Sequence, residues 1–454
     1  MSLSVDVSST LAYIQSRARF GVKPGLERIL YLLNGLGSPH DRLRFVHVAG
    51  TNGKGSTCVY TAQILQAAGY RVGLYTSPYL TAFAERMSVN GDPITAFELV
   101  QFTEQVRRVA QTVEGNPLLE PTEFEVITAV SMLFFLARNV DLVVLETGLG
   151  GRYDATNVVW PEVCALTNVA LDHTEILGKR VEEIAFDKSG IIKKKIPVFT
   201  GADSQALSVI ERIANEQQSP LWVLSRDLHV VFEGSFGVRG QRFSYFGMRR
   251  DYLGLQTRML GSHQLKNAAI ALGLVEALRE RGFAISDEAV RTGIATAKWP
   301  GRLEVIQEDP LVLLDGAHNP AAAHALAQAL KDLAIDRFVL VIGVLGDKDI
   351  EGIVHAIIKD CVHIVVTEPD VPRAAPVERL KDVVLHHVGA DVPVETVREV
   401  SSAVQRAVRL AKDLSLPLCI MGSLYTVAQA KAIFMQQAEG KYAREVEKQW
   451  QWDR

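Results

Sequence analysis

The chain has 454 residues, more than a single hydrophobic core of roughly 250–300 residues supports, so at least two domains are expected. Hydrophobic residues make up 48% of the sequence and charged residues 22%, a composition that excludes disordered and fibrous proteins. The formal net charge of −4 provides no overall positive field, so neither nucleic acid nor a membrane is expected as a partner. A small anionic ligand therefore requires a local basic site.

The cysteines and the hydropathy pattern point to a reducing, aqueous environment. The four cysteines lie far apart without a CxxC pair, which predicts buried thiols rather than disulfides or a zinc site. The start of the chain has no basic segment leading into an apolar one, and no apolar run approaches the roughly 20 residues that span a bilayer. A cytoplasmic protein is expected, and a monomer, because no exposed apolar helix stands out as an interface.

The first half of the chain alternates between short apolar runs and helical patterns. A strand at 44–49, a helix at 56–68 and a strand at 71–76 form a predicted βαβ unit. Further runs that are too short for helices and rich in Val, Leu and Ile predict buried parallel strands at 141–148, 162–169 and 196–201. Alternation with glycine turns at 228–260 predicts an antiparallel insert, followed by a helix.

The Pro-Gly pair within 296–305 is the predicted junction between two domains. Beyond it the alternation restarts, with strands predicted at 311–315, 338–344, 363–367 and 417–421 and helices at 321–333, 350–359, 376–388 and 401–412. The fold class is therefore α/β, with a first domain at 1–297 that holds a parallel sheet and a small antiparallel insert. A Rossmann-like α/β domain is predicted at 298–454.

The stretch "HVAGTNGKGSTCVY" (47–60) places glycines between a strand and a helix N-terminus, where backbone N–H groups and the helix dipole bind phosphate. Lys54 is expected to contact the β- and γ-phosphates, and Ser56 or Thr57 to reach Mg²⁺. The spacing differs from the standard P-loop, because Val48 occupies the first glycine position and Gly55 separates the lysine from the hydroxyl. An ordinary tight turn stays open at this point.

Polar residues follow two further predicted strands. Glu146 ends the run "LVVLE", the glycine-rich "GLGGRYDATN" with Arg152 and Asp154 comes next, and Asp172 and His173 follow the strand at 162–169. If these strands share a sheet with the first one, their ends converge on one rim, where a carboxylate commonly holds the Mg²⁺ of a nucleotide. Alternatively, Glu146 is an exposed residue at the end of its strand, and His173 has a structural role only.

Two later positions are more ambiguous. Lys188 lies on a predicted helix and, taken alone, reads as a solvated surface lysine. In the second domain "LLDGAHNP" places Asp315 and His318 after an apolar strand, although Asn319 and Pro320 could simply start the next helix.

Seven motifs occur together in one order: "VAGTNGKGST", "VLETGLGGRYDATNVV", "ALDHTEILG", "FDKSGIIK", "GSHQLKNAAIA", "PGRLE" and "LDGAHNP". In this order they resemble folylpolyglutamate synthases and dihydrofolate synthases of the Mur ligase superfamily, over residues of about 20 to 430. The resemblance implies that residues 1–297 form a P-loop-type Mur ligase central domain. It also implies a ligase that uses ATP to convert a carboxylate of folate or dihydropteroate into an acyl phosphate. The amino group of L-glutamate then displaces the phosphate. We expect both acceptors to be used, although the motifs do not decide between them.

The resemblance also implies roles for individual residues. The implied ATP contacts are Asn52, Gly53, Lys54, Gly55, Ser56, Asn267, Arg302 and Asp315. The implied ligands of two Mg²⁺ ions include Ser77, Glu146 and His173. Lys188 matches a lysine that is carbamylated by carbon dioxide, which replaces the surface-lysine interpretation and would supply an anionic oxygen ligand.

The remaining implied residues concern the substrates. Thr122 in "PTEFE", Asp154 and the segment "PGLERI" (24–29) resemble the pterin-contacting region. His318 is expected near the glutamate or the acyl phosphate, and with Lys54 and Lys188 it completes the predicted catalytic set.

Two alternatives remain from other classes. One is a Mur-type ligase with a non-folate acceptor, such as a cell-wall peptide ligase, which carries a further N-terminal domain that the 45 or so residues before the phosphate loop do not accommodate. The other is a non-catalytic P-loop switch, which needs neither "DGAHNP" nor a second α/β domain.

Overall fold

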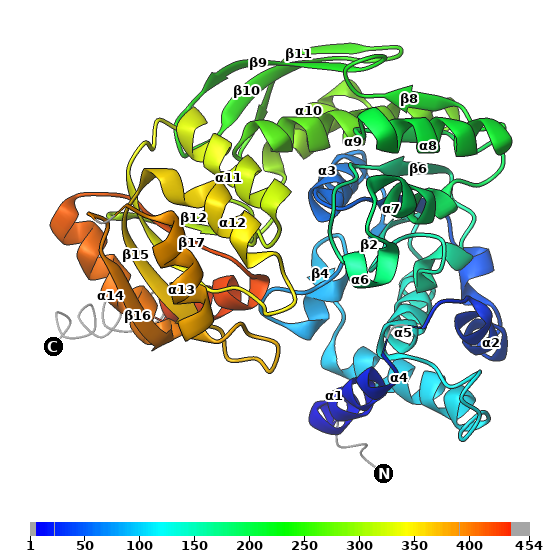
Figure 1. Cartoon of the computed structure of the whole chain (residues 1–454). Coiled ribbons are helices and arrows are strands. Elements are labelled where there is room, and N and C mark those ends of the chain that lie inside the picture. The colour runs from blue at the N-terminus through cyan, green and yellow to red at the C-terminus, as the bar shows by residue number, and fades with distance from the viewer. Residues whose placement is uncertain (1–5, 22, 390, 437–454) are drawn as a thin grey trace, which may run out of the picture. The chain divides into compact units, whose positions relative to one another are not determined.

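A computed structural model describes residues 6–21, 23–389 and 391–436 (Figure 1). Residues 1–5 of the predicted first domain and 437–454 of the predicted second domain lie outside these ranges. The chain divides into two compact units. The first contains 1–234, 242–258 and 264–297, and the second contains 235–241, 259–263 and the residues from 298 onward.

The first unit is built on a mostly parallel sheet. Within the described residues its strands run in the order β4-β3-β2-β5-β1-β6-β7-β8. Their bounds are β1 Phe45–Ala49, β2 Val72–Tyr75, β3 Met87–Val89, β4 Asp92–Pro93, β5 Leu142–Glu146, β6 Val163–Leu166, β7 Val198–Thr200 and β8 Leu221–Val223. Only the β2-β3 and β3-β4 pairs are antiparallel. Every residue of β1, β5 and β6 is buried, as expected for central strands covered on both faces.

Helices connect and cover these strands. Their bounds are α1 Val7–Ser16, α2 Glu27–Gly35, α3 Lys54–Ala67, α4 Ala96–Gln111, α5 Glu123–Ala137, α6 Thr174–Leu177, α7 Val181–Lys188, α8 Ser204–Glu216, α9 Ser262–Glu280 and α10 Asp287–Thr296. Helix α3 packs on β1, β2 and β5. Val143 and Leu145 of β5 join the core that α2, α4 and α5 bury. Capping boxes at Thr95 and Thr122 start α4 and α5, because each hydroxyl accepts an otherwise unpaired backbone N–H.

The predicted insert is a separate small sheet of three consecutive strands among the described residues, in the order β11-β10-β9. These strands are β9 His229–Ser235, β10 Gln241–Phe246 and β11 Asp251–Thr257. Figure 1 draws them in green as long ribbons ahead of α9 in the chain.

The second unit holds another sheet, in the order β12-β13-β17-β14-β15-β16. Its strands are β12 Glu304–Glu308, β13 Leu311–Asp315, β14 Phe338–Ile342, β15 Cys361–Glu368, β16 Val394–Glu399 and β17 Leu418–Met421. All of its pairs are parallel except β12-β13. The helices are α11 Pro320–Asp332, α12 Ile350–Ile357, α13 Val377–His387 and α14 Val400–Leu414, with residues 424–436 also helical. Figure 1 shows α12 and α14 on opposite sides of this sheet.

The α/β fold class, the parallel sheet and the predicted strands are confirmed, with boundaries shifted by a few residues. The sequence does not predict strands β3, β4, β8, β12 and β16, because they are short or lie at sheet edges and lack a continuous apolar run. The four cysteines are free and buried, as predicted. None of the described helices is both long enough and apolar enough to cross a membrane.

Candidate active site

The glycine-rich stretch lies between β1 and α3 and packs against two other segments. Gly50 and Gly53 have φ angles of +148° and +84°, which residues with a side chain rarely adopt. A Cβ at Gly50 would lie 1.9 Å from the Thr167 hydroxyl oxygen, and one at Gly53 would lie 2.3 Å from the Asn267 amide oxygen. Glycine is therefore required at both positions. The predicted nucleotide contact Asn267, on α9, lies directly against the loop.

The predicted convergence of three strand ends is confirmed. Strand β1 lies between β5 and β6, parallel to both, with Val48 opposite Glu146 and Ala49 opposite Leu166. Glu146, the last residue of β5, therefore ends beside the glycine-rich loop. Such carboxyl ends of parallel strands, at a point where the chain crosses to opposite sides, are the usual ligand-binding edge of a doubly wound sheet.

The three predicted magnesium ligands come from this same edge. The backbone N–H of Ser77, after β2, donates to Oε2 of Glu146 at 3.1 Å, so these two residues are adjacent. Glu146 is 4% exposed, which excludes the exposed strand-end interpretation. His173 caps α6 with φ +51° and keeps its side chain 39% exposed. No group of three His, Cys, Asp or Glu side chains among the described residues forms a ready-made metal site. Of the three predicted magnesium ligands, only Glu146 and His173 belong to these residue types, and the third is Ser77.

Two lysine side chains converge on one backbone oxygen. Nζ of Lys54, the first residue of α3, donates to the carbonyl of Gly50 at 3.0 Å and to that of Thr51 at 3.2 Å. Nζ of Lys188, the last residue of α7, donates to the same Gly50 carbonyl at 2.9 Å. Lys188 is 4% exposed, so its interpretation as a surface lysine is wrong. The two predicted catalytic lysines are thus brought together at the glycine-rich loop.

Burial, and then the neighbouring charge of Lys54, lower the pKa of Lys188 from 10.5 to about 7. A neutral amine is consequently accessible near neutral pH, whereas an ordinary lysine is protonated there. The free amine is the form that reacts with carbon dioxide, so the environment of Lys188 suits the predicted carbamylation chemically.

The glycine-rich loop after β5 docks on the end of α7. The backbone N–H of Gly151 donates to Oδ1 of Asp187 at 2.8 Å, and that of Arg152 donates to the Asp187 carbonyl at 2.8 Å. A Cβ at Gly151 would lie 2.5 Å from the Lys188 carbonyl oxygen. Asp187 therefore anchors this loop beside Lys188. Sequence reasoning missed it, although it stands next to the lysine in "FDKSG".

Asp154, predicted to contact the pterin, binds its own loop. Its Oδ2 accepts from the N–H groups of Gly148 and Leu149 at 3.0 and 2.9 Å, and its Oδ1 accepts from the backbone and hydroxyl of Thr156. It is 5% exposed, and burial raises the pKa of its carboxyl group. These four contacts make the carboxylate the organiser of the turn after Glu146.

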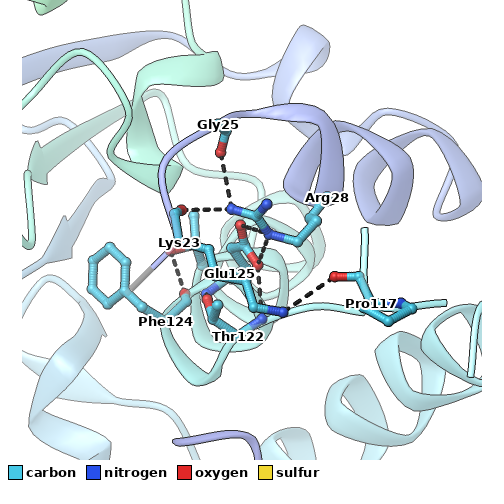
Figure 2. A network of polar contacts seen from close by, with 8 residues as sticks. Lys23, Gly25, Arg28, Pro117, Thr122, Phe124 and Glu125 are labelled. Carbon is cyan, nitrogen blue, oxygen red and sulfur yellow. Dashed lines mark hydrogen bonds and ion pairs between the residues drawn. The ribbon is translucent and has the colours of Figure 1, made fainter. Parts of the chain in front are cut away.

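Thr122 likewise has a structural partner. It caps α5, and its backbone N–H donates to Oε2 of Glu125 at 2.7 Å. Figure 2 shows Arg28 directed at this glutamate, with Nε 3.0 Å from Oε1. Nη2 of Arg28 also donates to the carbonyls of Lys23 and Gly25. The two segments predicted to contact the pterin, "PGLERI" and "PTEFE", are therefore joined by a buried ion pair, which sequence reasoning did not identify.

The second unit gathers its own predicted residues at the end of β13. Asp315 is buried, and its oxygens accept from the N–H groups of Leu303 and Ala317 at 2.7 and 2.8 Å. Burial raises the pKa of this carboxyl group, and the charge of Arg302 opposes the rise. Nδ1 of His318 donates to the Gly316 carbonyl at 2.8 Å. All three predicted residues of this unit therefore lie around one short turn.

Two Mur ligase family models match the chain. The Mur ligase middle domain matches residues 48–275, and the Mur ligase glutamate ligase domain matches 301–424. These matches identify a Mur ligase.

The relatives narrow the family. The chain is 38% identical to the dihydrofolate synthase/folylpolyglutamate synthase of Bacillus subtilis, over 92% of this chain and 97% of that protein. A folylpolyglutamate synthase from Mycobacterium tuberculosis, solved with ADP and AMPPCP, superposes with a TM-score of 0.88 at 32% identity, covering 94% and 99% of the two chains. Escherichia coli FolC, solved with DHPP and ADP, gives 0.85 at 31% identity and covers 95% and 98%. The chain belongs to the dihydrofolate synthase/folylpolyglutamate synthase family.

Proposed function

We propose that this chain is an ATP-dependent ligase that joins L-glutamate to a folate, and also to dihydropteroate, through an acyl phosphate. The observation that carries the proposal is the meeting of Lys54 and Lys188 at the Gly50 carbonyl, beside Glu146 at the end of β5. Relatives that share this family carry the names of both activities. The chain acts on small molecules, and we propose that it does so as a monomer.

The nucleotide is proposed to bind at the loop between β1 and α3. The triphosphate contacts are Asn52, Gly53, Lys54, Gly55 and Ser56, with Asn267 packed against the loop. Residues 1–297 are proposed as the ATP-binding domain and 298–454 as the second ligase domain, which contributes Arg302 and Asp315 to ATP binding. The structures of relatives with ADP and AMPPCP support nucleotide binding in this family.

Ser77, Glu146 and His173 are proposed to hold Mg²⁺, with a second ion near the carbamate of Lys188. The buried carboxylate of Glu146 and the serine hydroxyl are hard oxygen donors, which Mg²⁺ prefers. When bound, the ions neutralise phosphate charge that would otherwise repel the acceptor carboxylate.

The protein side chains then have distinct tasks in the reaction. Lys54, at the N-terminus of α3, is proposed to contact the phosphates and to stabilise the charge that develops as the acceptor carboxylate attacks the γ-phosphate. Asp154 shapes the turn that receives the acceptor, and Thr122 starts the helix on which the pterin is proposed to rest. His318 is proposed to lie near the incoming glutamate or the acyl phosphate. Holding both reactants in line accounts for much of the acceleration in such a reaction.

The test is a direct assay. The purified chain is incubated with Mg-ATP and L-glutamate, and either dihydropteroate or tetrahydrofolate monoglutamate is added. Phosphate release and the mass of the product are both recorded. If each of the two acceptors gives a product that is heavier by one glutamyl residue, the full proposal is supported. A product with one acceptor restricts it to that substrate, and phosphate release without either product contradicts the folate assignment.

A further inference from the structure

Three buried side chains form a continuous series of hydrogen bonds across the first unit. Nε2 of His47, in the middle of β1, lies 2.8 Å from Oγ1 of Thr156, a residue of the 3₁₀ helix Ala155–Val158. That hydroxyl donates to Oδ1 of Asp154 at 2.5 Å. His47 and Thr156 are 0% exposed and Asp154 is 5% exposed, so water does not compete for these contacts.

The direction of each hydrogen bond follows from the number of protons available. The Thr156 hydroxyl has one proton, and it is directed at Asp154, so this oxygen accepts from His47. Burial lowers the pKa of His47 to about 3, which keeps the ring neutral. Because the Thr156 oxygen accepts from the ring, the single ring proton lies on Nε2. Nδ1 of His47 has no partner in the part of the chain that the structure describes. The contact with Thr156 is consequently the one that orients this ring.

The two ends of this series lie at the two loops that bear the proposed site. His47 precedes Gly50 by three residues on the strand that leads into the phosphate loop. At the other end Oδ2 of Asp154 accepts from the N–H groups of Gly148 and Leu149, the turn that follows Glu146. The series therefore links the strand before the phosphate loop to the turn after the strand that carries Glu146.

We propose that His47 and Thr156 are positioning residues that hold the Asp154 carboxylate, and through it the Gly148–Leu149 turn, in register with the phosphate loop. This proposal rests on the proposed function, in which that turn receives the acceptor. Both residues are 0% exposed, so neither is available to contact the reacting atoms. Their loss should therefore weaken use of the acceptor while leaving the binding of ATP intact.

The first test is Thr156→Val, which keeps the branched shape and removes both hydroxyl contacts. The value of kcat/KM for the acceptor should fall about 10- to 100-fold, the range found when a residue that orients a metal ligand is lost. The Kd for ATP should stay within about twofold. Thr156→Ser, which retains the hydroxyl, should recover most of kcat/KM. Unchanged kinetics in Thr156→Val, or an equal fall in the valine and serine variants, would overturn the proposal.

A second pair of variants covers the case in which Thr156→Val does not fold. His47→Leu removes the donor and should lower kcat/KM in the same way, whereas His47→Gln presents an amide N–H and should retain more of it. Thr103→Val is the matched control, because the Thr103 hydroxyl on α4 is also buried but has no partner among the described residues. A comparable kinetic loss in this control contradicts a specific role.

Amide hydrogen exchange separates this proposal from the proposed function, because it needs no turnover. In Thr156→Val the amides of Gly148 and Leu149 should exchange at least about tenfold faster than in the wild type, since Oδ1 of Asp154 keeps the Thr156 backbone N–H but loses the hydroxyl that links it to His47. Unchanged exchange overturns the positioning role even if the enzyme is active. If exchange is faster but the chain adds glutamate to neither acceptor, the positioning role is supported and only the folate assignment is refuted.

Discussion

Nζ of Lys188 and Nζ of Lys54 donate to the same carbonyl oxygen, that of Gly50, from 2.9 and 3.0 Å. One neutral oxygen cannot compensate two full charges, so the more deeply buried lysine gives up its proton more readily. Burial and the charge of Lys54 bring the pKa of Lys188 to about 7. The pair thus places a fixed cation and a reactive amine at the start of the phosphate loop.

The depressed pKa makes Lys188 costly for stability in a defined pH range. Its pKa falls from 10.5 to about 7 on folding, so between these values the unfolded chain binds a proton that the folded chain does not. The free energy of unfolding therefore rises with pH between pH 7 and 10.5. Below about pH 7 the destabilisation caused by burying Lys188 is at its full value. In buffer free of carbon dioxide, Lys188→Met should be more stable than the wild type at pH 6–7, by on the order of 4 kcal/mol.

Denaturant unfolding at several pH values measures this difference. The gain should shrink as pH approaches 10, and the exposed-site control Lys194→Met should show no such trend. If Lys188→Met is less stable than the wild type at pH 6, the conclusion that the buried Lys188 ammonium destabilises the fold is wrong.

The amine of Lys188 should also be a site of reversible carbamylation. With ¹³C-labelled carbon dioxide, the wild type should show a carbamate carbon signal that weakens as pH falls below about 7, because the ammonium does not react. Lys188→Ala should lack this signal and be inactive, with partial recovery on addition of short-chain carboxylates that replace the missing oxygens. Wild-type turnover in Lys188→Ala would remove this residue from the site.

Lys54→Ala should abolish ligation while largely preserving the fold. The half-buried Lys54 donates to two carbonyls of its own loop, so its removal should lower the melting temperature by no more than a few degrees. Turnover should fall at least about 100-fold, since the charge at the phosphates is lost. Thermal melts and the phosphate-release assay, run beside Lys194→Ala, check both parts. A melting loss as large as that of a core truncation would show a structural role instead.

The sequence predicts the sheet edge of this site but not the burial of its side chains. Apolar runs before Gly50, Glu146 and Asp172 mark three strands, and the parallel pairing of β1 with both β5 and β6 makes their ends neighbours. Periodicity does not report that Lys188 turns inward at the end of α7, because a lysine on a short helix carries the same pattern whether exposed or buried.

Long-range pairing is a second limit of the sequence. Arg28 and Glu125 are 97 residues apart, and neither has a local signature of its partner. Capping boxes are visible in the sequence, and Thr122 and Glu125 form one, so Thr122 has a structural task besides its predicted substrate contact. Whether Thr122 also contacts the pterin stays a prediction.

The Arg28–Glu125 pair should stabilise the N-terminal segment. Both side chains are nearly buried, at 7% and 5% exposure, so Glu125→Gln leaves an uncompensated guanidinium and should cost about 3–5 kcal/mol in the free energy of unfolding. Glu216→Gln, in the exposed Arg212–Glu216 pair, should cost less than about 1 kcal/mol. Urea unfolding of both variants makes the comparison. The double variant Arg28→Met/Glu125→Gln should recover part of the loss, and no recovery would argue against a specific pair.

Gly53→Ala should disable the phosphate loop for two separable reasons. Alanine is strained at φ +84°, and its Cβ would lie 2.3 Å from Oδ1 of Asn267. We expect the Kd for ATP to rise at least about 50-fold, with a stability cost of about 1–3 kcal/mol.

Gly69→Ala is the matched control, because Gly69 has φ +90° but nothing within 4 Å of an added Cβ. It should show the backbone cost alone, with ATP binding unchanged. The double variant Gly53→Ala/Asn267→Ala removes the clash but keeps the backbone strain, so its stability should rise toward that of Gly69→Ala. Its affinity for ATP should stay low, because Asn267 is itself a proposed ATP contact. Calorimetric titration with ATP and urea unfolding measure the two quantities, and wild-type ATP affinity in Gly53→Ala would exclude this loop as the triphosphate site.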